Sequence, residues 1–138
     1  SVHLWVGGEH YVQPMTVVMD PRVKTPAAGL KLQDQLSMDC YNGRKDCLAM
    51  LSAIKAWPAA HGAQVSADST TLKKISAISG EGNASDTSLS SLAQRFQSLQ
   101  GLLQSADVTP TSQAVSGVAN AKAILALLRK EWNALKTR

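Results

Sequence analysis

The first part of the chain alternates apolar and polar positions with the period of a β-strand, interrupted by a glycine pair. The mostly apolar set comprises Val2, Leu4 and Val6, then Gly7-Gly8, then Tyr11, Gln13, Met15, Val17 and Met19. Paired glycines tolerate positive φ and favour a tight turn, so the pattern predicts a hairpin. Pro14 removes one backbone donor and places the second strand at an edge or a bulge. Because two strands alone are barely stable in water, we expect the hairpin either to pack on the helices or to need a sheet formed upstream of Ser1.

After residue 24 the apolar spacing changes to alternating steps of three and four, which predicts amphipathic helices. Thr25-Pro26 supplies a capping hydroxyl followed by proline at the first helical position. A long helix is expected from there to the residue before Pro58. Gly43 lies on its apolar face and would admit a neighbouring backbone. The face consists of Leu36, Cys40, Gly43, Cys47, Met50, Ile54 and Trp57.

A shorter helix is predicted from Val65 to Ser79, capped by Asp68 or Ser69 and stopped by Gly80. Its apolar side comprises Leu72, Ile75 and Ile78, and residues 80–83 form a loop. The third helical pattern starts near Asp86-Thr87-Ser88 and should end near Asp107. Its apolar positions are Leu89, Leu92, Phe96, Leu99 and Leu103.

The last helix is expected to follow Thr109-Pro110, a second hydroxyl-proline pair, and to reach the C-terminus. Its apolar positions are Val118, Ala121, Leu125, Leu128, Trp132 and Leu135. The short connection 106–109 favours antiparallel neighbours. The sequence therefore predicts a mainly α fold, an antiparallel bundle of three to four helices (residues 25–138) preceded by a β-hairpin (residues 1–24). We expect Leu99 and Leu128 to lie at the centre of the bundle core, and Lys122 to extend beside it into water.

Composition narrows the class of protein without indicating a reaction. The 138 residues are 44% hydrophobic and 17% charged, as in a single globular domain. The net charge of +4 comes from scattered basic residues such as Lys73-Lys74, with no basic groove interleaved with aromatic residues, so no nucleic-acid partner is expected. The apolar stretches are too short to span a bilayer, and residues 1–20 lack the regions of a signal peptide.

Cys40 and Cys47 are the only cysteines. On one helix, seven residues separate them by roughly 10.5 Å, beyond the distance that a disulfide bridges. The heptad spacing favours two buried, reduced thiols. The alternative is a turn at Asn42-Gly43 that breaks the helix and brings the two sulfur atoms together.

The other candidate residues for chemistry favour structural roles. His3, His10 and His61 are assigned to two strands and a loop, without further ligands at metal-binding spacing, so no metal site is predicted. The carboxylates of Asp34, Asp39 and Asp46 are assigned to the solvated face of the long helix. Trp57 and Trp132 are expected in the core, whereas Trp5 would cover a neighbour outside this chain. No catalytic residue, cofactor site or metal ligand is therefore assigned.

Two segments resemble one family of proteins. Residues 2–25 resemble the end of the last β-sandwich of large bacterial BNR-repeat, sortilin-like β-propeller proteins, often labelled glycosyl hydrolases, and the core of the match is the strand followed by Met19-Asp20-Pro21-Arg22-Val23. Residues 102–111 are similar to the bend between the last two helices of that family. Residues 59–88 match no motif, and the two cysteines are not part of the family pattern. The family's propeller would lie upstream, so no catalytic residue is carried over.

The resemblance implies a non-catalytic, structural C-terminal region of a larger secreted or periplasmic protein, and residue 1 is then not a natural beginning. The region would pack against the propeller and sandwich of its own protein, or against a protein partner, away from the membrane. The alternative is an accessory region that orients the upstream catalytic propeller of a glycan-active hydrolase. A third, weaker option is an adaptor whose helical groove binds a partner helix. Paired carboxylates or an arginine cluster upstream would favour the hydrolase.

Overall fold

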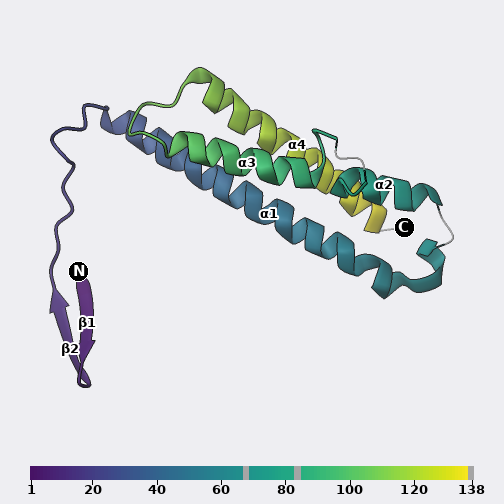
Figure 1. Cartoon of the computed structure of the whole chain (residues 1–138), viewed down its shortest axis with the longest axis horizontal. Coiled ribbons are helices and arrows are strands. Elements are labelled where there is room, and N and C mark those ends of the chain that lie inside the picture. Colours follow the sequence, from purple (N-terminus) through teal and green to yellow (C-terminus); the bar gives the residue numbers. More distant parts are fainter. Residues whose placement is uncertain (67–68, 83–84, 137–138) are drawn as a thin grey trace.

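The computed structural model consists of a two-stranded hairpin followed by four helices (Figure 1). It describes residues 1–66, 69–82 and 85–136, and side chains are described for these residues except 59–66 and 69. The elements are β1 (Val2–Val6), β2 (Glu9–Gln13), α1 (Ala27–Ser66), α2 (Ser69–Ser79), α3 (Leu89–Leu103) and α4 (Ser112–Lys136). The mainly helical bundle with an N-terminal hairpin confirms the predicted fold class.

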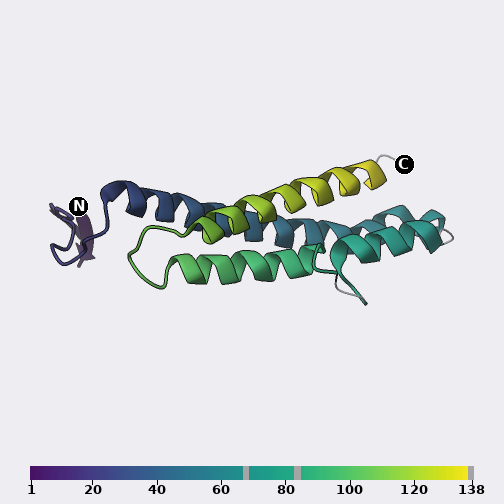
Figure 2. The same cartoon turned by 90° about the horizontal axis from the view of Figure 1, so that it is seen from above.

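The four helices form three rods, because α2 and α3 together make one rod with a break between them. Asp39 pairs with Lys122 and Asp46 with Arg129, so both partner numbers rise by seven and α1 runs parallel to α4. Helices α2 and α3 run in the opposite direction and follow one another along α1 (Figures 1 and 2). Helices α3 and α4 are antiparallel neighbours joined by a short connection, as predicted.

The predicted apolar faces form one core between the rods. The face of α1 turns inward as expected, with Cys40 and Cys47 fully buried and Ile54 nearly so. From α3 the fully buried residues are Leu89, Leu92 and Phe96, and from α4 the buried residues are Ala114, Val118, Ala121, Leu125, Leu128, Trp132 and Leu135. Alternating steps of three and four keep a position on one side of a helix, which is why the pattern identifies the core so well.

Three core assignments need correction. Leu99 is only partly buried and lies over Gly117 of α4, at the border of the core. Leu72 is 41% exposed, because steps of three turn the face of a helix by about 60° each and carry this residue away from Ile75 and Ile78. The space beside Gly43 is filled by the ring of Phe96, not by a neighbouring backbone.

Helix α1 does not end before Pro58 as predicted but continues through it to Ser66. Proline removes one helical hydrogen bond and commonly bends the helix, and the last part of α1 turns away from the axis of the first part (Figure 1). The residues beyond Pro58 are rich in alanine, which has the highest helix propensity. We attribute the continuation to this propensity together with the contact of Trp57 with Trp132, whose ring centroids lie 5.8 Å apart.

The remaining boundaries shift by a few residues. Helix α2 begins at Ser69, so residues 65 and 66 belong to α1, while Asp68 and Asn83 lie outside the described residues. Gly80 stops α2 with φ +86° as predicted, and α3 starts next to the predicted residues 86–88, where Ser88 caps it by accepting a hydrogen bond from the Ser91 N–H.

Both hydroxyl-proline pairs serve different purposes from those predicted. The Thr25 hydroxyl donates to the Asp107 carbonyl, while the Pro26 carbonyl accepts the first helical hydrogen bonds of α1. At α4 the cap is Thr111, whose Oγ1 accepts from the Ala114 N–H at 3.2 Å. Helix α3 ends at Leu103 instead of Asp107, and Gln33 Nε2 donates to the carbonyls of Leu103 and Ala106, which have no helical partner there.

Candidate interaction surface

The hairpin is the largest group of exposed apolar residues in the described chain. Gly7 and Gly8 adopt φ of +60° and +90°, the left-handed conformation of a tight two-residue turn. Pairing starts at Val6 with Glu9 and ends at Val2 with Gln13. The second strand therefore stops before Pro14 instead of reaching Met19, because β1 offers no partner beyond Gln13 and Pro14 has no N–H to pair.

The pairing register divides the hairpin into two faces. Directly opposed residues share a face, so Leu4 and Tyr11 lie together, flanked by Val2 and Val6. We call these four residues the aliphatic face. Each of them is 47% to 57% exposed. In an ordinary sheet one face of this composition would be buried.

The opposite face carries three neighbouring rings. Trp5 and His10 lie 4.6 Å apart between ring centroids, and His3 and His10 lie 5.1 Å apart. His3 Nδ1 and His10 Nε2 are within hydrogen-bond distance at 2.9 Å. The rings cover one another, yet Trp5 remains 65% exposed. The structure thus brings together two of the three histidines, which sequence spacing did not predict because cross-strand register is set by the turn.

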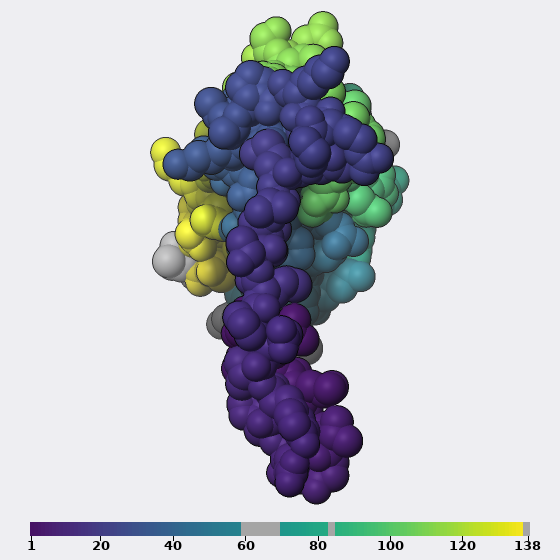
Figure 3. All heavy atoms as spheres, turned by 90° about the vertical axis from the view of Figure 1, so that its left-hand side faces the viewer, coloured from purple at the N-terminus to yellow at the C-terminus, as the bar shows by residue number. Residues whose placement is uncertain are grey.

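The hairpin stands away from the bundle. Within the described residues neither strand contacts a helix. Viewed from the hairpin end, it projects below the helices as a separate arm (Figure 3). The first of the two expectations for the hairpin, packing on the following helices, is therefore wrong for this chain.

The segment from Pro14 to Lys24 connects the hairpin to α1 without regular structure. Asp20 and Arg22 form its one ordered turn, with Arg22 Nη2 2.8 Å from Asp20 Oδ2 and the Arg22 N–H donating to Asp20 Oδ1 at 2.9 Å. This pairing lowers the pKa of the Asp20 carboxyl. Val17 and Val18 are 82% and 77% exposed, so the apolar surface continues beyond the hairpin.

The two cysteines lie in the bundle and not at this surface. Both are free and buried on the continuous helix α1, which excludes the alternative of a break at Asn42-Gly43. The pKa of each thiol is raised to about 11, mainly by burial and in smaller part by the neighbouring Asp39 and Asp46. A neutral, buried thiol is a weak nucleophile, so these cysteines serve the core.

The acidic residues of α1 have a role that the sequence did not reveal. Lys122 Nζ lies 2.7 Å from Asp39 Oδ2, and Arg129 Nη2 lies 2.6 Å from Asp46 Oδ2. These carboxylates join α1 to α4 instead of facing water alone, and Lys122 is likewise not free. Asp34 is exposed as predicted. Residue 61 lies in α1 and not in a loop, while its side chain is outside those described.

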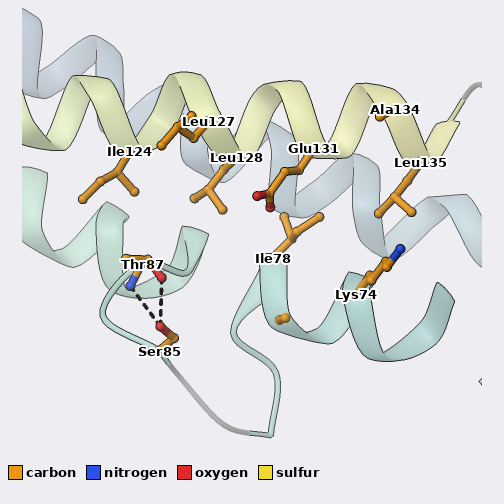
Figure 4. Close-up of a pocket in the computed structure, with 11 residues that line it drawn as sticks. Lys74, Ile78, Ser85, Thr87, Ile124, Leu127, Leu128, Glu131, Ala134 and Leu135 are labelled. Atoms are coloured by element: carbon orange, nitrogen blue, oxygen red, sulfur yellow. Dashed lines mark hydrogen bonds between the residues drawn. The ribbon is translucent and has the colours of Figure 1, made fainter. Parts of the chain in front are cut away.

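A pocket of about 660 Å³ lies between α2 and α4, where the broken rod leaves α4 partly uncovered (Figure 4). Its α4 wall is apolar except for Glu131, and Lys74 of α2 is the other charged residue. Ser85 and Thr87 are joined by a hydrogen bond of 2.9 Å between their hydroxyls and lie at one side. The apolar spacing placed Leu128 and Leu135 in the core as predicted, but it did not indicate the cavity, because the cavity depends on where α2 stops.

Comparison of the chain with protein-family models, with curated proteins and with solved structures gives no match. Among the described residues, no helix is both long and apolar enough to cross a membrane. No group of three or more histidine, cysteine, aspartate or glutamate side chains in the same part of the chain is arranged to hold a metal ion.

Proposed function

We propose that this chain is the non-catalytic C-terminal structural region of a larger secreted or periplasmic β-propeller protein, joined to it through the hairpin. In this proposal the helical bundle is a preformed unit, and the hairpin adds to a β-sheet of the preceding sandwich. The observation that carries it is the hairpin itself, a well-paired element whose apolar face is left uncovered by the described part of the chain.

Two physical arguments support a docking role. The aliphatic face carries four large side chains that are about half exposed, and burying apolar surface contributes roughly 25 cal/mol per Å². The hairpin also has two unpaired edges, which are templates for addition of a further strand. To bury the aliphatic face and to pair a free edge, the hairpin needs a neighbouring sheet that has an apolar surface and an unpaired edge strand.

The packing of the bundle does not depend on the hairpin, and this supports a structural role for the chain. Its core is assembled from all four helices and contains no residue of β1 or β2. The hairpin can therefore join a neighbouring sheet without repacking the helices, and the turn at Asp20 and Arg22 leads from one to the other.

Amide hydrogen exchange tests the proposal in this chain and in the longer polypeptide that contains it. In the chain alone we expect weak protection over residues 2–13 and strong protection over 125–135, because poorly covered elements open first. In the longer polypeptide, residues 2–13 should gain protection while 125–135 stay the same. Unchanged, weak protection of residues 2–13 in the longer polypeptide would refute the proposal.

A pair of variants adds a control. Leu4→Asn removes an apolar residue of the aliphatic face, and Leu102→Asn makes the same change at a 60% exposed position of α3. Leu4→Asn should leave the thermal unfolding of the chain alone unchanged but destabilise the longer polypeptide. Leu102→Asn should behave alike in both. Equal effects of Leu4→Asn in the two settings would contradict docking through this face.

A further inference from the structure

The pocket between α2 and α4 carries a second, independent inference. Three apolar residues of α4, Ile124, Leu127 and Leu128, face it, followed by Ala134 and Leu135 toward the C-terminus (Figure 4). From Ile124 to Leu135 this stripe is roughly 16 Å long at about 1.5 Å per residue, with Glu131 between Leu128 and Ala134. The volume of about 660 Å³ lies within the range of about 300–1,000 Å³ for small-molecule sites.

The apolar wall is not sealed by the protein. Leu127 is 62% exposed although it lines the pocket, whereas Leu128 is 7% exposed beside it. The chain stops α2 at Gly80 and resumes the rod at Leu89, so no continuous helix covers this part of α4. A ligand with an alkyl or aryl tail would cover the exposed side of Leu127 and remove that surface from water.

Two opposite charges face the same space. In Figure 4 the Glu131 carboxylate points from α4 toward Ile78, and the Lys74 ammonium points from α2 toward Leu135. On other faces of the bundle opposite charges meet, as Asp39 and Lys122 do. Lys74 and Glu131 form no ion pair within the described residues, with each other or with another side chain.

We propose that this pocket binds a small zwitterionic amphiphile, a molecule with one apolar tail and a head that carries a positive and a negative charge. The tail lies along the α4 stripe, the cationic group of the head faces Glu131, and the anionic group faces Lys74. A purely anionic head is repelled by Glu131, and a purely cationic head is repelled by Lys74. The charges on the two walls therefore select the head, while the stripe selects the tail.

Three probes with the same ten-carbon tail test the charge argument: decylphosphocholine, decanoate and decyltrimethylammonium. Each is titrated into the chain below its micelle concentration, with binding followed by calorimetry. Decylphosphocholine should bind about threefold to tenfold more tightly than the other two, as expected for two partly exposed charge pairs. Equal affinities for the three probes, or no saturable binding of decylphosphocholine, would overturn the proposal.

Charge variants assign the roles of the two walls. Glu131→Gln should abolish the preference for the zwitterion over decanoate, and Lys74→Gln should abolish the preference over decyltrimethylammonium. Lys73→Gln is the matched control, because Lys73 is adjacent in the sequence but does not line the pocket. A control variant that shifts the preferences as far as Lys74→Gln would overturn the assignment.

Two further arms test the tail and the source of the head group. Leu127→Asn should weaken all three probes about fivefold, while Leu102→Asn should change them less than about twofold, since only Leu127 lines the pocket. Equal losses in the two variants would refute binding at this wall. With phosphatidylcholine vesicles we expect the chain to stay in the supernatant, and cosedimentation that Leu127→Asn abolishes would assign the pocket to a membrane surface instead of a single molecule.

Discussion

Replacing Gly43 with alanine should destabilise the protein, although the same change in most helices is stabilising. Gly43 lies in the middle of α1, where alanine contributes about 1 kcal/mol of helix propensity over glycine. A Cβ at this position would lie 2.5 Å from Cζ of Phe96 and 2.7 Å from both Cε atoms. Carbon atoms in contact are normally about 3.5–4.0 Å apart, so the ring would have to move by about 1 Å.

Phe96 has no free space into which to move, because its side chain is fully buried in the core. Overpacking of this kind costs about 1–3 kcal/mol. The propensity gain offsets part of that cost, and we expect Gly43→Ala to lower the free energy of unfolding by about 1 kcal/mol and by no more than about 2 kcal/mol. Chemical denaturation followed by helical circular dichroism measures the change.

Gly101 provides the matched control. It is a glycine of α3 with no heavy atom within 4 Å of an added Cβ, so Gly101→Ala should stabilise the protein by about 0.5–1 kcal/mol. In a Phe96→Leu background, which removes the tip of the ring, Gly43→Ala should become neutral or stabilising. If Gly43→Ala in the wild-type background is as stable as the parent, the close contact of α1 with Phe96 is wrong.

Three further predictions concern the core and its border. Cys40 and Cys47 should resist thiol reagents in the native state and give two free thiols in denaturant without reductant; fewer than two would contradict the continuous helix. Because folding raises their pKa from 9.0 to about 11, the unfolded chain loses these protons first, so stability should fall as pH rises from about 9 to 11 in denaturation experiments, and a flat profile would contradict burial. Leu128→Ala should lower the free energy of unfolding by about 2–5 kcal/mol, and Leu99→Ala by less, because Leu99 is only half-buried. Lys122→Ala should lower it by no more than about 1 kcal/mol. A denaturation midpoint for Leu128→Ala equal to that for Lys122→Ala would refute the core assignment.

The sequence predicted the helical faces well because a face depends on local spacing alone. Cys40, Phe96 and Leu125 were all placed inward from steps of three and four, and all are buried. The ends of helices were predicted less well, since they depend on contacts from elsewhere in the chain. At the end of α3 the Leu103 carbonyl accepts from Gln33, which is 70 residues away in the sequence, and no local pattern near Leu103 indicates this contact.

The candidate surfaces show the same difference between features that depend on local spacing and features that depend on distant contacts. The glycine pair and the alternation of residues 2–6 predicted the hairpin, and its lack of cover was one of two expectations. The pairs of Asp39 with Lys122 and of Asp46 with Arg129 could not be predicted, because their partners are 83 residues apart. The pocket beside Leu127 was missed for a related reason, since it is formed by the end of one helix opposite the side of another.

The repeat of the ion pairs between α1 and α4 raises a question of register that Gly43 of α1 answers. If α4 slid by seven residues, Lys122 would face Asp46 and one of the two ion pairs would survive, so charge alone distinguishes the registers weakly. A heptad slip of α3 is different in kind. It would bring the ring of Phe96 against residue 36 or 50, where a leucine or a methionine occupies the space that Gly43 leaves open. The missing side chain at Gly43 thus leaves room for the ring of Phe96 at one position only. This contact fixes the alignment of α1 with α3, whose heptad patterns would otherwise fit at several positions.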